Sequence, residues 1–388
     1  MKPKFIAFFI LVILIWSCKK KSQDPAPVVE AVKEPISSIE KEVLINYLNT
    51  AQAAYLDAYE TTDSLNIKIK AFVQNPDAIR FETCKAAWKR ARIFYGQTEA
   101  YRGLGGPIEE YESFINAWPL DEAYVDYVYD STKVKNVYGG IINDTVAYKN
   151  LDYLTIRNAN LALGDAAVST GYHAIEFLLW GQDFYNEGAG KRSFTDYTFG
   201  TNAVRRGKYL AIVSQMLVYD LQAVLTDLNK TYKEDLLNPV TLNYNCFTIL
   251  NGISQMSKGE FGGERIIPAL ETKNQEDEHS CFSDNTHIDI LMNAIGMQSL
   301  YTGTFTKRNG QKIQGRSFAK FVESLAPATN KSAVDQLNKL VLEAKLISAP
   351  FDQAVMSDNG GHILNTSKDW LKFGDLMNTS AELVRSAK

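Results

Sequence analysis

Residues 43–55 read VLINYLNTAQAAY, and their apolar side chains return every three or four positions. In a helix this spacing places Val43, Tyr47 and their apolar neighbours on one face, which predicts a helix with a buried stripe. The same spacing recurs in residues 84–95 and 209–228. Alternating apolar and polar residues, which are typical of half-buried strands, are scarce. The sequence therefore predicts an all-α fold built from bundles of long antiparallel helices.

Further helices are expected along the chain. Asn75 is a suitable N-cap residue, Pro76 suits a first helical turn, and Gly103 is a suitable stop for the helix between them. Other segments with helical spacing are residues 241–270, 286–302, 317–325, 333–346 and 368–386.

Two halves are predicted, joined near residues 181–200, where Gly, Asn and Asp are frequent. An N-terminal helical bundle is expected at 39–195 and a C-terminal one at 196–388. Residues 169–176 (STGYHAIE) are weakly similar to residues 294–301 (AIGMQSLY). An internal duplication explains this similarity, and so does chance.

The first residues have the pattern of a secretory signal. Two lysines precede the apolar run Phe5–Trp16, which is too short to cross a bilayer as a helix. Leu14–Cys18 resembles a lipobox, so we expect a signal peptide at 1–17 and a lipidated, flexible tether at 18–38; an ordinary signal peptide with a chance cysteine is the alternative. Lipidation of Cys18 predicts a lipoprotein of the cell envelope, attached to the outer membrane and facing the periplasm or the cell surface.

Charge and cysteine content exclude several classes of protein. The formal net charge is -4, which argues against nucleic acid or anionic lipid as the main partner. Beyond Cys18 the cysteines are Cys84, Cys246 and Cys281, an odd number without CxxC spacing. The sequence therefore predicts neither a disulfide framework nor a thiolate metal site. It also lacks a P-loop and a GxSxG segment.

His173 and Glu176 are the first candidates for chemistry. Their spacing of three places both side chains on one face of a helix beginning near Ser169 or Thr170. There they can bind a shared cation, or they can simply hydrogen-bond to each other inside a bundle. The zinc-protease patterns HExxH and HxxEH fail because Ala174 and Phe177 occupy required positions.

The residues on either side of His173 resemble a known sequence motif. The segment 171–181, GYHAIEFLLWG, resembles the GxHxxE motif of the imelysin-like family, which includes iron-regulated lipoproteins. Four more blocks of the sequence resemble the family, and the blocks follow one another as they do in the family. They are Trp88 with Arg92 and residues 97–100, then 116–121, 259–265 and 279–287. The resemblance extends over nearly the whole chain from about Ile39.

The resemblance implies two helical bundles with a cleft between them and with Gly171, His173 and Glu176 at the cleft. It also implies a link to iron acquisition in the bacterial envelope, whereas the family name derives from an insulin-cleaving membrane peptidase. These two activities make different demands on a metal site.

As metal ligands, His173 and Glu176 supply two groups. A third ligand is expected to be a carboxylate brought in by folding, and the candidates are Glu99, Glu260 and Glu264. Arg265 is expected to pair with a carboxylate or with an anionic ligand. One imidazole among carboxylates suits iron at least as well as zinc. We therefore expect binding of iron or of an iron-bearing ligand at the cleft. The alternatives are a metallopeptidase with Glu176 as its catalytic residue and an adaptor lipoprotein for an outer-membrane uptake receptor.

A second acidic segment is also a candidate. The run Glu276–His279, with Asp284 and His287, can hold a cation. Acidic residues before a helix also stabilise its N-terminus electrostatically, and Asn285 can cap that helix. Both interpretations remain open from the sequence.

Overall fold

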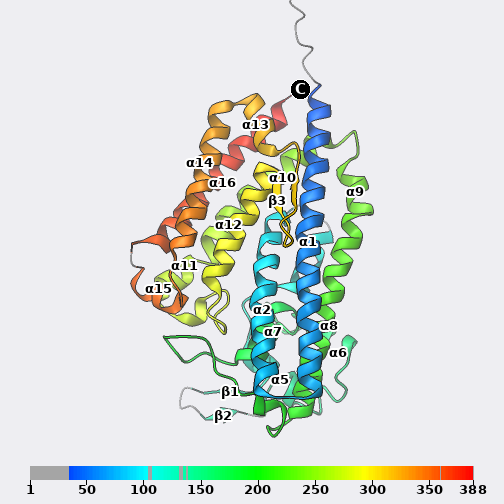
Figure 1. Cartoon of the computed structure of the whole chain (residues 1–388), viewed down its shortest axis with the longest axis vertical. Coiled ribbons are helices and arrows are strands. Elements are labelled where there is room, and N and C mark those ends of the chain that lie inside the picture. Colours follow the sequence, from blue (N-terminus) through cyan, green and yellow to red (C-terminus); the bar gives the residue numbers. More distant parts are fainter. Residues whose placement is uncertain (1–34, 104–106, 131–133, 137–138, 359, 388) are drawn as a thin grey trace, which may run out of the picture. The chain divides into compact units, whose positions relative to one another are not determined.

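The computed structural model describes residues 35–103, 107–130, 134–136, 139–358 and 360–387 (Figure 1). The predicted signal peptide, Cys18 and most of the predicted tether lie outside these residues. Export and lipidation therefore stay predictions.

The described residues are mostly helical, as the apolar spacing predicted. The longer helices are α1 Ile36–Gln74, α2 Ala78–Thr98, α3 Pro107–Ile115, α7 Gly171–Trp180, α8 Ala203–Leu228, α10 Leu242–Met256, α12 Thr286–Thr302, α13 Phe318–Leu325, α14 Pro327–Leu346 and α16 His362–Ser386. Shorter turns of helix are α4 Glu122–Val125, α5 Gly140–Asn143, α6 Tyr153–Ala159, α9 Thr231–Leu236, α11 Ile267–Thr272 and α15 Phe351–Ser357, with η1 Glu99–Tyr101, η2 Phe194–Tyr197, η3 Ser257–Glu264 and η4 Gln275–Asp277.

Two small antiparallel ribbons complete the described part. Strand β1, Val128–Tyr129, pairs with β2, Lys135–Asn136, and Val128 lies opposite Asn136. Strand β3, Thr304–Thr306, pairs with β4, Lys312–Gln314, with Phe305 opposite Ile313. Each ribbon is too short to form a sheet with its own core, so the fold class is all-α.

Helix α1 is the central element of the described body. Its stripe of apolar residues is buried along its length, and it packs against α2 and α8 (Figure 1). Among the described residues, one stretch, Ala203–Leu236, is long and apolar enough to cross a membrane, but more than half of its apolar 18-residue window is buried inside the protein. Because α8 packs against α1, α3 and α7, this stretch acts here as a core helix.

Helices from the second half of the chain pack on the same framework. Helix α16 packs against α10 and α14, and α12 packs against α2. Helix α1 also contacts α10, α12 and α13, so it touches elements on both sides of residue 195. The division into bundles at 39–195 and 196–388 and the internal duplication stay predictions.

Several helix ends differ from the expected ones. Asp77 caps α2 by accepting a hydrogen bond from the Arg80 backbone N–H at 2.7 Å, so the expected N-cap at Asn75 is wrong. The expected helix at 241–270 is divided, because after α10 the chain continues as the wider π-helix η3. Asn285 precedes α12 but does not cap it with its side chain.

A cluster of buried charges fastens the segment after α4 to α8. Asp126 accepts hydrogen bonds from Arg192 Nη1 and from Arg206 Nε, both at 2.6 Å, and from Arg206 Nη2 at 2.8 Å. Burial opposes ionisation of Asp126, but the two arginines outweigh it and lower the pKa of this carboxyl to about 2. The cluster therefore holds an ionised aspartate inside the protein.

Candidate functional site

Helix α7 carries His173 and Glu176, and the packing around its first residue explains its glycine. Gly171 has φ +83°, and a Cβ there would lie 2.5 Å from the carbonyl oxygen of Ile115. Only glycine fits this close approach without strain. Every residue of α7 is buried, so the helix is fixed in place with its two polar side chains inside the protein.

The two polar side chains of α7 hydrogen-bond to each other. His173 Nδ1 lies 2.9 Å from Glu176 Oε2. The other oxygen of Glu176 accepts hydrogen bonds from Ser283, from its backbone N–H at 3.0 Å and from its hydroxyl at 2.6 Å. Burial raises the pKa of Glu176 to about 8, although Ser283 and Arg92 oppose this shift.

A second imidazole lies beside the first. The rings of His173 and His279 have their centroids 4.7 Å apart and meet edge to face. His279 Nδ1 lies 3.0 Å from Asp289 Oδ2, on the first turn of α12. The sequence had placed His279 in an acidic run before a helix and did not predict that it lies next to His173.

Asp289 is fixed by several donors. It accepts hydrogen bonds from the Ser280 hydroxyl at 2.5 Å and from Arg92 Nε at 3.2 Å, and it forms an ion pair with Arg92 at 2.9 Å. Burial opposes ionisation of Asp289, but Arg92 and His279 hold its pKa well below the usual range. Because an ionised carboxylate only accepts hydrogen bonds, the proton of His279 is on Nδ1, and Nε2 is a free acceptor or ligand.

Both imidazoles are held neutral and leave one nitrogen unused. Burial and nearby arginines lower the pKa of His173 to about 3 and that of His279 to about 4. Among the described residues, neither Nε2 atom has a hydrogen-bond partner, and both are buried. A neutral imidazole with its Nδ1 held by a carboxylate is the usual form of a histidine that ligates a metal.

The other predicted ligands form an ion-paired network. Arg265 Nη2 donates to Glu99 Oε1 and to Glu260 Oε1, each at 2.5 Å. Glu99 also accepts hydrogen bonds from Asn116 at 3.1 Å and from Asn293 at 2.7 Å. The arginine is thus paired with carboxylates, and both carboxylates have counter-charges. Their roles as metal ligands stay predictions, as does that of Glu264, which is exposed.

A small cavity of about 120 Å³ reaches this network. Its lining includes the side chain of His279 and the predicted residues Glu260, Glu264 and Arg265, together with Arg102, Glu112, Asn116, Ala117 and Trp118. The cavity joins His279 to the charged network, and it contains no large apolar wall. It suits a small polar ligand.

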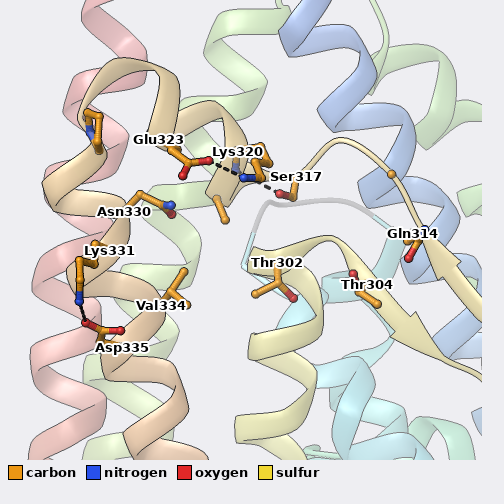
Figure 2. Close-up of a pocket in the computed structure, with 13 residues that line it drawn as sticks. Thr302, Thr304, Gln314, Ser317, Lys320, Glu323, Asn330, Lys331, Val334 and Asp335 are labelled. Atoms are coloured by element: carbon orange, nitrogen blue, oxygen red, sulfur yellow. Dashed lines mark hydrogen bonds and ion pairs between the residues drawn. The ribbon is translucent and has the colours of Figure 1, made fainter.

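A larger hollow, of about 800 Å³, lies between the end of α12, the β3–β4 ribbon and the turn from α13 to α14 (Figure 2). Its charged side chains pair at the surface, Lys320 with Glu323 at 2.6 Å and Lys331 with Asp335 at 2.5 Å. The hollow offers no group suited to chemistry.

Comparison with known proteins shows the family of this chain. The sequence model of the family described as Imelysin matches residues 51–370. This chain belongs to the imelysin family. No curated protein sequence matches it significantly.

Two solved structures share the fold of this imelysin-family protein. The first, described as an iron-regulated protein A precursor, is from Parabacteroides distasonis and is 16% identical, with a TM-score of 0.69 over 91% of this chain and 96% of that one. The second is an imelysin-like protein from Psychrobacter arcticum, 14% identical, with a TM-score of 0.55 over 91% of this chain and 95% of that one. At these identities the comparisons show the fold alone.

Proposed function

We propose that this imelysin-family protein binds a transition-metal cation, iron in the first place, through the Nε2 atoms of His173 and His279. One observation carries the proposal: the Nε2 atoms of two adjacent buried imidazoles have no partner among the described residues, while each Nδ1 lies against a carboxyl group. A buried polar atom without a partner is unfavourable, so a ligand on these nitrogens would stabilise the site. The remaining ligands would be water or a group of the bound species.

The carboxyl groups that contact the Nδ1 atoms of the two imidazoles support metal binding by the Nε2 atoms. Glu176 and Asp289 orient the rings and increase the basicity of the ligating nitrogens. A cation on His173 would also favour the ionised form of Glu176, which burial disfavours in the free protein. Imidazole nitrogen with oxygen donors is a ligand set that iron accepts.

The size of the cavity favours a hydrated ion over an organic chelate. At about 30 Å³ per water molecule, a cavity of this kind holds only a few waters, and it measures about 120 Å³. Pockets for organic ligands are typically about 300–1,000 Å³. Of the two expected ligands, iron and an iron-bearing molecule, the ion is the better fit.

Iron is the preferred metal because one structural neighbour is described as an iron-regulated protein A precursor. A signal peptide and a lipidated Cys18 would place such a protein in the envelope, where iron is taken up. In this proposal the protein receives iron there and passes it to an uptake receptor of the outer membrane.

A peptidase makes a different demand on the same residues. Its general base has to reach a metal-bound water beside a peptide bond. Glu176 is fully buried, and its oxygens are engaged by His173 and Ser283. The small cavity beside His279 leaves no space for a peptide, so these observations support binding better than hydrolysis.

Calorimetric titration of the protein with ferrous and zinc ions, under anaerobic conditions, tests the proposal. The comparison is with a His173→Ala, His279→Ala double variant and with His362→Ala, because His362 pairs with Glu343 at 2.8 Å away from this site. We expect stoichiometric binding that is lost in the double variant and kept in the control, with iron preferred. Equal binding by the double variant would refute the site, and an absence of metal binding would favour the adaptor.

A further inference from the structure

Four buried carboxyl groups gather beside the loop that carries His279. Asp183 follows α7, Glu278 follows η4, Asp284 precedes α12, and Asp352 lies in the first turn of α15. Their exposed fractions are 2%, 0%, 5% and 4% respectively. Four acidic residues from three segments of the chain thus meet in the interior.

These carboxyl groups have almost no hydrogen-bond donors. Asp183 accepts one hydrogen bond, from the Tyr185 backbone N–H at 2.8 Å. Among the described residues, no partner is found for its other oxygen or for either oxygen of Glu278, Asp284 and Asp352. Glu278, which has no exposed surface, interacts most strongly with Asp352 and Asp284. It therefore points into the cluster, not away from it.

The cluster has the geometry of a coordination sphere. One oxygen from each of Asp183, Asp284 and Asp352 lies within 4.8 Å of the others, and this is the one such group of three among the described residues. Oxygens bound to a common Ca²⁺ lie about 2.3–2.6 Å from it, so they are up to about 5 Å apart. The observed grouping fits that limit.

Among the described residues, the charge of the cluster is only partly compensated. Lys89, half-buried beside Trp180, acts on Asp284, and Lys273 lines the same cavity as Asp183, Glu278 and Asp352. Burial and mutual repulsion raise the pKa of Asp183 and that of Asp284. A bound cation would relieve this repulsion.

We propose that Asp183, Glu278, Asp284 and Asp352 bind one hard divalent cation of the calcium class. All four side chains offer oxygen, which Ca²⁺ prefers, and none offers the nitrogen or sulfur that softer metals favour. A cavity of about 270 Å³, lined by Asp183, Glu278 and Asp352 among other residues, gives water access to complete the coordination sphere. The site is separate from the imidazole pair, and it does not depend on the proposed function.

The loop from Glu278 to Asp289 connects the two sites. Glu278 is followed directly by His279, and Ser283, which holds Glu176, is followed directly by Asp284. Asp284 has φ +53°, in the left-handed region that aspartate adopts more readily than most residues. A cation on Glu278 and Asp284 would hold this loop in the conformation that places His279 and Ser283. These two carboxylates are thus positioning residues for the imidazole pair.

Calcium titration of the chelator-treated protein tests the proposal, with thermal unfolding and terbium luminescence as measurements. We expect one equivalent of Ca²⁺ to bind and to raise Tm by roughly 3–5 °C at free Ca²⁺ about 100-fold above Kd. Terbium is expected to occupy the same site and to be displaced by Ca²⁺. Magnesium, which prefers a smaller and more regular shell, is expected to compete weakly.

Asp284→Asn and Asp352→Asn are each expected to abolish the Ca²⁺-dependent rise in Tm, and the second variant covers the possibility that the first fails to fold. Asp235→Asn, at an exposed aspartate in α9, is the matched control and is expected to respond like the unaltered protein. The His173→Ala, His279→Ala variant is expected to keep the calcium response, which separates this proposal from the iron site. Absence of a calcium response in the unaltered protein, or its persistence in both cluster variants, would overturn the proposal.

Discussion

Two buried clusters of charged residues in this protein differ in how fully the chain supplies counter-charges to their aspartates. Both oxygens of Asp126 accept hydrogen bonds from arginine, and its pKa is lowered to about 2. Near α15, Asp284 and Asp352 have no donor among the described residues, and their pKa values are raised. All three carboxyls are buried, with exposed fractions of 0% for Asp126, 5% for Asp284 and 4% for Asp352. The arginine partners of Asp126 therefore account for the opposite direction of its pKa shift.

Residues near the two imidazoles differ in the same way, because some have all their partners within the chain and others do not. Glu99 is surrounded by Arg265, Asn116 and Asn293, so its hydrogen bonds and its charge are satisfied within the chain. The Nε2 atoms of His173 and His279 are buried without a partner. The charge of Glu99 is satisfied within the fold, whereas a metal ion bound as proposed would supply the partner that the two Nε2 atoms lack.

The largest expected effect is loss of the satisfied cluster. Asp126→Asn would leave Arg192 and Arg206 with an uncompensated buried charge, and we expect the free energy of unfolding to fall by roughly 3–5 kcal/mol. Urea denaturation measures this change. Asp335→Asn, in an exposed pair with Lys331, is the control and is expected to change stability by less than about 0.5 kcal/mol. Similar effects of the two substitutions would contradict the comparison.

Acid should remove the contribution of Asp126 gradually. Because its pKa is lowered in the folded protein, its ionised form stabilises the fold above the usual aspartate pKa, and this contribution is lost as the pH falls toward about 2. The shift corresponds to roughly 2–3 kcal/mol. The stability difference between the unaltered protein and Asp126→Asn, measured by denaturation, should shrink by this amount between about pH 5 and pH 2. A difference independent of pH would show that the aspartate is not ionised.

In the cluster of Asp183, Glu278, Asp284 and Asp352, removing one carboxylate should not lower the stability of the free protein. In the presence of a chelator, Asp352→Asn relieves repulsion among buried carboxyls, so we expect stability to stay unchanged or to rise by on the order of 1 kcal/mol. With calcium added, the unaltered protein should be the more stable of the two. Thermal unfolding with and without calcium measures the stability difference between the two proteins under each condition. Strong destabilisation of the variant in chelator would contradict this expectation.

Local patterns allowed much of the fold to be predicted. Apolar spacing is a property of neighbouring residues, and so α1 and α12 followed from it. The spacing of three placed His173 and Glu176 on one helix face, where their mutual hydrogen bond was one of the two interpretations. The Asn75 cap was wrong because Asp77, two residues on, supplies the acceptor. The expected helix at 241–270 missed the π-helix, because the segment 257–264, SKGEFGGE, has one large apolar residue and so gives no pattern that marks the wider turns.

Contacts between distant segments were not predictable in this way. His279 lies beside His173 although the two are far apart in the sequence, and no spacing rule connects them. The acidic run from Glu276 was a cation candidate in the sequence, and this stays a prediction; Asp183 and Asp352 join the run only through the packing of α7 and α15. An acidic residue flanking each of two helices was a signal too common to single out.

The π-helix Ser257–Glu264 sets the rotation of the chain that follows it. The Arg265 backbone N–H donates to the carbonyl oxygen of Glu260, five residues earlier, at 3.0 Å. Each hydrogen bond of a π-helix spans one residue more than that of an α-helix, so this segment accommodates an extra residue while the chain on either side keeps its place. A Cβ added at Gly259 would meet no atom within 4 Å, so this is a position where one residue can be removed without disturbing a neighbour. A protein shortened there is expected to return to α-helical hydrogen bonding with Arg265 still facing Glu99.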